Sequence, residues 1–84
     1  MILIENRGGK VKLSQLPVGE TAKVMEVLAR DNQQRRLLDL GLTVGTEVKV
    51  EKRSPLGDPT AFLIRGTIIA LRSEETELIK VTKI

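Results

Sequence analysis

The feature that most constrains this sequence is a series of short stretches in which apolar and polar residues alternate, separated by turn residues. The clearest is Thr46–Lys52, where Val48 and Val50 share one parity and the charged residues share the other. This alternation predicts a half-buried antiparallel strand. The chain has only 84 residues, 40% of them hydrophobic, and a flat sheet this short would not enclose them. The pattern therefore predicts an all-β fold, a small bent barrel of five to six short antiparallel strands with one short α-helix inserted.

Four further stretches share the β-branched and apolar composition of strands, and they are Thr21–Leu28, Ala61–Arg65, Thr67–Arg72 and Ile79–Ile84. In the first the apolar parity changes, which predicts a β-bulge or strong bend near Val24. Gly66 indicates a sharp bend or bulge within one ribbon. The runs Phe62–Ile64 and Ile68–Leu71 are apolar at both parities, so either the barrel covers both faces or one face remains an exposed patch. Burial of both runs at a barrel corner is expected.

Between Asp31 and Gly41 the apolar period changes from two residues to about 3.6. The spacing predicts a short helix over Gln33–Leu40, capped by the side chain of Asp31 or Asn32 and ended by Gly41 in a left-handed conformation. Its leucines would pack on the sheet, because a helix of two turns is not stable alone in water. A second helical turn is expected to begin at Ser73.

The chain is expected to consist of two regions, an N-terminal extension over residues 1–10 and one barrel domain over residues 11–84. The glycines Gly8 and Gly9 form a joint, and Met1–Ile4 either frays or adds an edge strand. The four apolar residues of this start are too few for a signal peptide or a membrane span. A cytoplasmic protein without membrane insertion is therefore expected.

The chain contains no Cys, His, Trp or Tyr. Disulfides, thiolate nucleophiles, zinc fingers and histidine bases are therefore excluded, and enzymatic activity is not expected. We assign no catalytic, cofactor-binding or metal-binding residue. The acidic residues Glu74, Glu75 and Glu77 are interpreted as a solvated face at a helix start rather than as iron ligands.

The run Arg35–Leu42 (Arg-Arg-Leu-Leu-Asp-Leu-Gly-Leu), followed by Val-Gly-Thr, resembles the FeoA family, small cytosolic accessory proteins of bacterial ferrous-iron transport. Three more pieces in the same order support the resemblance: Leu13–Gly19, Ser54–Pro59 and Gly66 through Leu71-Arg72 to Ile79. The resemblance implies an SH3-like barrel and association with FeoB, a membrane-bound GTPase transporter. The same module is similar to the C-terminal domain of iron-dependent repressors, although this chain has no helix-turn-helix portion.

Two segments are candidates for contact with such a partner. Arg35 and Arg36 are suited to phosphate recognition or to acting as an arginine finger toward a GTPase, or they are surface arginines paired with Asp39. The loop after the third predicted strand is rigid and carries one apolar side chain, which either docks a partner or folds back onto the barrel. The loop residues are Pro55, Leu56, Gly57, Asp58 and Pro59.

Two rival functions remain as alternatives. A peptide-binding adaptor or a single-strand nucleic-acid module needs several aromatic side chains, and Phe62 is the only aromatic residue. The net charge is +3 and the signs alternate, so nucleic acid is not an expected partner, although backbone-only binding by a small basic barrel is the alternative class. Weak homo-oligomerisation is left open by the apolar barrel edges.

Overall fold

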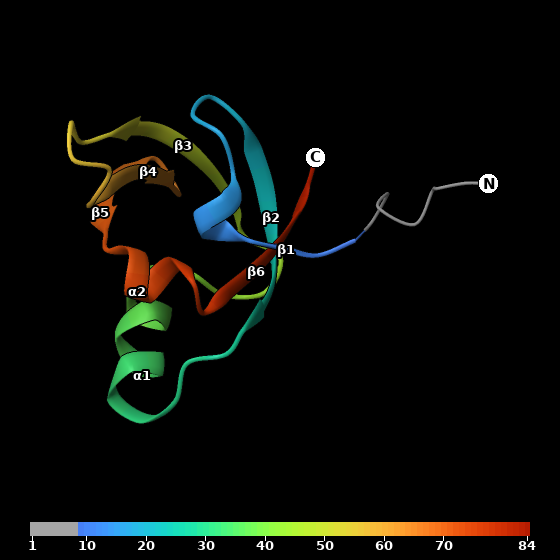
Figure 1. Ribbon diagram of the computed structural model, residues 1–84. Helices are drawn as coiled ribbons and strands as arrows, with labels where there is room; N and C mark the ends of the chain where they lie inside the picture. The colour runs from blue at the N-terminus through green and yellow to red at the C-terminus, as the bar shows by residue number, and fades with distance from the viewer. Residues whose placement is uncertain (1–8) are drawn as a thin grey trace.

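The alternating stretches fold into one antiparallel sheet in the computed structural model, which describes residues 9–84. Within that range the sheet has six strands in the order β1-β6-β2-β3-β4-β5, and it curls on itself into a small barrel (Figure 1). The predicted all-β fold is confirmed. The strands are β1 Val11–Lys12, β2 Thr21–Val27, β3 Glu47–Arg53, β4 Thr60–Ile64, β5 Thr67–Leu71 and β6 Ile79–Lys83.

Bulges bend two of these strands. The predicted irregularity in β2 is confirmed, because its register against β6 shifts between Val24 and Glu26. A second shift lies between Val50 and Lys52, where β3 pairs with β4. Each added residue increases the local twist and bends the strand, which allows so short a sheet to enclose a core.

The core collects one face of each long strand and is completed by side chains from the connections. A 3₁₀ helix, Leu13–Gln15, follows β1 and supplies Leu13, with Leu16 directly after it. The buried hydrophobic residues are Leu13, Leu16, Ala22, Val24, Ala29, Leu37, Leu42, Val48, Val50, Phe62, Ile64, Leu71, Ile79 and Val81. The alternation of Val48 and Val50 toward the core is as predicted.

The inserted helix, α1, spans Asp31–Asp39 and so begins two residues before the predicted start. The predicted side-chain cap is wrong: Arg30 occupies the cap position without a side-chain hydrogen bond, and Asp31 is the first helical residue, with φ of 54°. The carboxylate of Asp31 still lies in the first turn, where the helix dipole favours negative charge.

The end of α1 is as predicted. Gly41 adopts a left-handed conformation with φ of 99°, and its amide donates to the carbonyl of Leu38 at 2.9 Å. The amide of Leu42 donates to the carbonyl of Leu37 at 3.0 Å, which completes a Schellman motif. Because Leu37 and Leu42 are both fully buried, this motif also anchors the helix to the core.

A tight hairpin joins β4 to β5. Arg65 and Gly66 form a two-residue turn, with φ of 51° and 80° respectively, and Ile64 pairs with Thr67. Two successive positive φ values are the signature of a type I′ turn. The expectation of a bend or bulge within one ribbon is therefore corrected, because the chain reverses completely at this point.

A second short helix, α2, spans Ser73–Thr76 and confirms the predicted helical turn. The suggested strand at Met1–Ile4 lies outside the described residues. At the described start, the hydroxyl of Thr82 donates to the carbonyl of Gly9 at 3.3 Å. None of the helices in residues 9–84 has the length and apolar character needed to cross a membrane.

Candidate protein-docking face

The two predicted partner-binding segments lie on either side of α2. The loop 54–59 connects β3 to β4, and α1 projects from the other end of the barrel, with α2 between them (Figure 1). The carboxylate of Asp58 accepts a hydrogen bond from the amide of Ser73 at 2.8 Å, so the loop is tied to the start of α2. On the other side, Arg36 of α1 forms an ion pair with Glu75 of α2. The loop, α2 and α1 thus form one connected face.

The loop 54–59 presents its apolar side chain to solvent. Leu56 is 94% exposed, so it does not fold back onto the barrel. The loop is closed by the amide of Ser54, which donates to the carbonyl of Pro59 at 3.2 Å. The amide of Gly57 donates to the carbonyl of Ser54 at 2.8 Å. Restricted backbone around an exposed leucine lowers the entropy lost when such a loop binds.

The two arginines of α1 have different surroundings. The expected pairing of both with Asp39 is not observed: Arg36 pairs with Glu75, and within residues 9–84 Arg35 forms no ion pair. Glu75 reaches Arg36 because one carboxylate oxygen is already held in place, accepting the amide of Arg72 at 2.9 Å. Arg36 is therefore paired within the protein, whereas Arg35 has no ion-pair partner in the described chain.

The acidic residues after β5 do not form one solvated face, which corrects the earlier interpretation. Glu75 is buried in its ion pair, with 8% of its surface exposed. Glu77 accepts hydrogen bonds from the amine of Lys12 at 2.9 Å and the hydroxyl of Ser14 at 2.8 Å, and these bonds lower the pKa of its carboxyl. Of these three residues, only Glu74 is exposed and without an ion-pair partner in the described chain. Residues 9–84 contain no cluster of three potential metal ligands.

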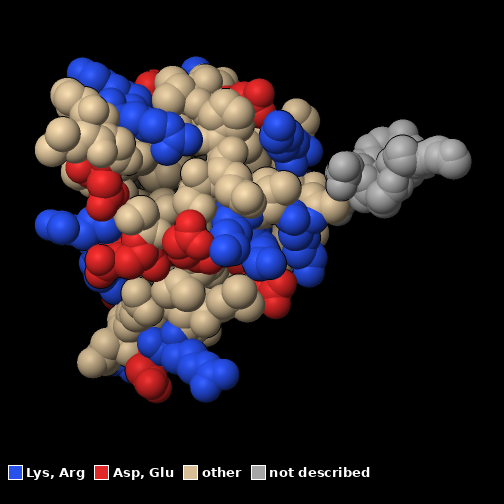
Figure 2. Space-filling model, in the orientation of Figure 1, with Lys and Arg blue, Asp and Glu red and all other residues tan. Residues whose placement is uncertain are grey.

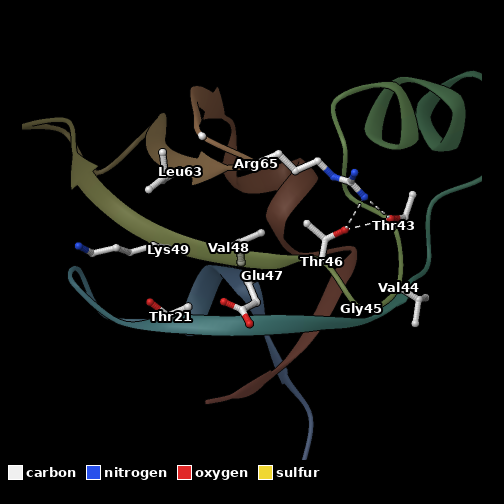
Figure 3. A pocket seen from close by; sticks show the side chains of 11 residues that line it. Thr21, Thr43, Val44, Gly45, Thr46, Glu47, Val48, Lys49, Leu63 and Arg65 are labelled. Carbon is white, nitrogen blue, oxygen red and sulfur yellow. Dashed lines mark hydrogen bonds between the residues drawn. The ribbon is translucent and has the colours of Figure 1, made fainter.

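A hollow of about 630 Å³ lies beside the β4–β5 turn, and Arg65 forms part of its wall (Figure 3). Its guanidinium donates to the hydroxyl of Thr43 at 3.1 Å and of Thr46 at 3.2 Å, and to the carbonyl of Gly41 at 3.4 Å. Gly41 has φ of 99°, which favours glycine, and a Cβ there would also lie 3.1 Å from the Arg65 side chain, which would have to shift by a few tenths of an ångström. Arg65 thereby ties the β4–β5 turn to the connection between α1 and β3.

A groove of about 560 Å³ lies between β5 and the end of α1. Its apolar wall includes Leu38, Leu40 and Ile69. On the other side of the strand Ile68 is 57% exposed and Ala70 is exposed as well, so the expected burial of the whole run at a barrel corner is wrong for these two residues. Phe62, Ile64 and Leu71 are buried as expected.

The contacts of Glu75 and Arg65 were not expected from the sequence, and for the run Ile68–Leu71 an exposed patch was one of two alternatives, with burial expected. For Arg65 a signal was present, because an X-Gly pair between two strands is typical of a hairpin turn. For the exposure of Ile68, the signal in the sequence was the absence of any charged residue in Thr67–Leu71. The partner of Glu75 lies far away in the sequence, so no local pattern identified it.

Charged side chains of both signs lie on the face of the described residues that Figure 2 shows. In the view of Figure 2, acidic and basic side chains are interspersed, with uncharged surface between them. Nucleic-acid binding through the phosphate backbone needs a continuous basic stripe, and this face does not present one.

Comparison with known proteins gives consistent matches. Residues 11–83 match the FeoA domain family model. The chain is 31% identical over 71 residues to the Fe(2+) transport protein A/Fe(2+) transporter FeoB fusion protein of Porphyromonas gingivalis, with 84% of this chain covered. It spans 8% of the length of that relative.

Solved structures of similar proteins agree with the family match. The FeoA protein from Chlorobium tepidum superposes with a TM-score of 0.83 at 40% identity, covering 88% of this chain and 70% of that one. FeoA from Stenotrophomonas maltophilia, described as a prokaryotic SH3 domain protein complexed with zinc, gives 0.77 at 32% identity, covering 88% and 95%. The SH3-like barrel is therefore confirmed.

A manganese-dependent transcriptional repressor shares the fold alone, with a TM-score of 0.80 at 18% identity over 42% of its chain. The family model, by contrast, matches most of the present sequence. The chain therefore belongs to the FeoA family.

Proposed function

We propose that this chain is a non-enzymatic accessory protein of ferrous-iron uptake, which acts in the cytosol by contacting the cytosolic GTPase portion of FeoB. The observation that carries the proposal is the fusion relative, in which a similar segment and a FeoB transporter form one polypeptide. Fusion raises the effective concentration of one protein around the other, which is an advantage when the two act together. Two proteins that are fused in one organism therefore often act together where they are separate.

The contact face we propose is the one built around α2. Leu56 and Arg35 are its exposed contact residues, since neither is used inside the protein. Arg36 and Asp58 position the face, because each holds one flank of it to α2. Pro55, Gly57 and Pro59 shape the loop that presents Leu56.

The test is a binding measurement between this chain and the purified cytosolic portion of FeoB in each nucleotide state, by calorimetry. Leu56→Glu should weaken binding by roughly tenfold or more, as expected for removal of an apolar anchor. Val44→Glu is the matched control, because Val44 is 68% exposed and lies on the connection between α1 and β3. No detectable association at tens of micromolar, with both components folded, would remove the proposal.

Arg35 provides a second measurement. If its guanidinium stabilises charge on the GTPase, Arg35→Lys should abolish any stimulation of GTP hydrolysis while binding is retained, because lysine lacks the planar fork. Equal stimulation by the variant would restrict Arg35 to a docking role.

A further inference from the structure

The free edge of β5 has unpaired main-chain groups. Because the two-residue turn closes on Ile64 and Thr67, these two residues form a hydrogen-bonded pair, and every second pair beyond them does the same. Ile68 and Ala70 lie in the intervening pairs, so their amide and carbonyl groups point away from β4. Among residues 9–84, no backbone hydrogen bond outside the β4–β5 pairing involves the amide or carbonyl groups of Ile68 and Ala70.

Side chains leave this edge unprotected as well. Sheets normally protect an edge with charges, proline or a covering segment. In β5 the sequence is Thr-Ile-Ile-Ala-Leu, without charge or proline, and both Ile68 and Ala70 are exposed. They lie opposite Leu63 and Ala61 of β4, so the outer surface of the hairpin is apolar.

The groove described above runs beside this edge. Thr67 and Ile69 of β5 line it together with Leu38 and Leu40 from the end of α1. A strand added next to β5 would alternate its side chains between the two surfaces. One set would enter the groove against Leu38 and Ile69, and the other would extend the apolar outer surface beside Ile68.

Charge indicates which strand fits. Arg72 directly follows β5, and Arg65 precedes it with Gly66 between them. Neither arginine forms an ion pair within the described chain, although the Arg65 guanidinium also donates the hydrogen bonds to Gly41, Thr43 and Thr46 described above. Antiparallel pairing with a second copy of β5 would bring Arg72 of one copy beside the Arg65–Gly66 turn of the other, which is unfavourable for like charges. The nearby carboxylates, Asp39 and Glu74, belong to α1 and α2 rather than to the strand.

We propose that β5 is a strand-addition site that binds an extended segment of another protein, with small β-branched residues in the middle and acidic residues at both ends. The inference goes beyond the proposed function, because it assigns a binding mode and a ligand class to an edge regardless of which protein supplies the segment. Main-chain hydrogen bonds to Ile68 and Ala70 would supply affinity, and the groove and the arginines would select the segment.

The test titrates the isotope-labelled full chain with the synthetic peptide Glu-Val-Thr-Val-Thr-Val-Glu, followed by amide hydrogen exchange. In the free protein the amides of Ile68 and Ala70 should exchange rapidly, whereas those of Thr67, Ile69 and Leu71 are protected. With saturating peptide, Ile68 and Ala70 should become protected. Peptide binding without that change would overturn the proposal, as would the absence of peptide binding at millimolar concentration.

Variants of the chain and of the peptide distinguish main-chain pairing at the β5 edge from charge attraction alone. Ala70→Pro removes the outward amide and should weaken peptide binding by roughly tenfold, whereas Ala70→Ser keeps the amide and should bind like the wild type. The peptide with lysine at both ends should bind more weakly than the acidic one, and equal binding would overturn the charge assignment. Protection of Ile68 and Ala70 that rises with protein concentration alone would show that a second copy is the occupant instead.

Discussion

At one edge of the sheet, β1 is two residues long, and its Lys12 pairs with Glu77; at the other, β5 is five residues long and carries no charged side chain. Lys10, next to β1, also pairs with Glu26 at 3.3 Å. The two edges belong to the same sheet, so the difference does not follow from the fold. A short strand with lysine is a usual protection against pairing with another chain. The protection of β1 indicates that the exposure of β5 is a specific property of that strand.

The largest expected effect tests whether α1, which forms one wall of the groove beside β5, is anchored to the core through Leu37. Leu37→Ala should lower the free energy of unfolding by about 2 to 5 kcal/mol, because it removes fully buried methyl groups and leaves a cavity. Urea unfolding measures the change. Leu38→Ala is the control, since Leu38 is 42% exposed on the same helix and should cost about 1 kcal/mol or less. Equal losses in both variants would show that α1 is not anchored through Leu37.

The ion pair between the two helices should rank next. Glu75→Gln keeps an oxygen to accept the amide of Arg72 but loses the charge opposite Arg36, so we expect a loss of about 1 to 2 kcal/mol. Glu74→Gln, in the exposed neighbour, should change stability by less than about 0.5 kcal/mol. Amide exchange of Val11 and Lys12 should be unaffected in both variants. Faster exchange at β1 would indicate that the two edges are coupled.

Removing the charge from β1 tests directly whether its lysine protects this edge. Lys12→Ile eliminates the exposed ion pair with Glu77 and should lower the free energy of unfolding only slightly, because solvent screens such a pair. The same change leaves β1 without charge and should increase self-association, measured by analytical ultracentrifugation. An unchanged monomer fraction at high protein concentration would mean that the shortness of β1, and not its lysine, protects the edge.

The smallest effect is a pH dependence at the same edge. Hydrogen bonds from Lys12 and Ser14 lower the pKa of Glu77 in the folded protein. The unfolded chain therefore takes up a proton at higher pH than the folded one. The contribution of Glu77 to stability is fully present above the ordinary pKa of a glutamate, about 4, and is lost as the pH falls through the lower folded value. Glu77→Gln should flatten thermal stability over that acid range, and an unchanged profile would contradict the assignment.

Much of the fold could be predicted because it depends on neighbours in the sequence. The alternation in β3, the parity change that produces the bulge in β2 and the glycine that ends α1 are all local signals. The predicted start of α1 was wrong because a capping preference is weak compared with the extended geometry of the chain at Arg30.

The candidate face was predicted only in part. The loop around Leu56 was identified because prolines and glycine mark an exposed turn. The partner of Arg36 was not, because Asp39 is near in the sequence while Glu75 is brought close only by the barrel. An ion pair depends on the distance between two side chains in space. The sequence indicates that distance only for residues within one helix or strand.

Five of the six strands, the apolar side of β3 and the residue types that the chain lacks could be read from the sequence, because periodicity and residue type act over a few positions, whereas the two-residue strand β1 is too short to show a pattern. The arrangement of the loop 54–59, α2 and α1 as one face, and the position of β5 at a free edge beside a groove, depend on the folded barrel. Strand order and the contacts between distant segments result from closing the barrel around a shared core, and no single segment specifies that closure.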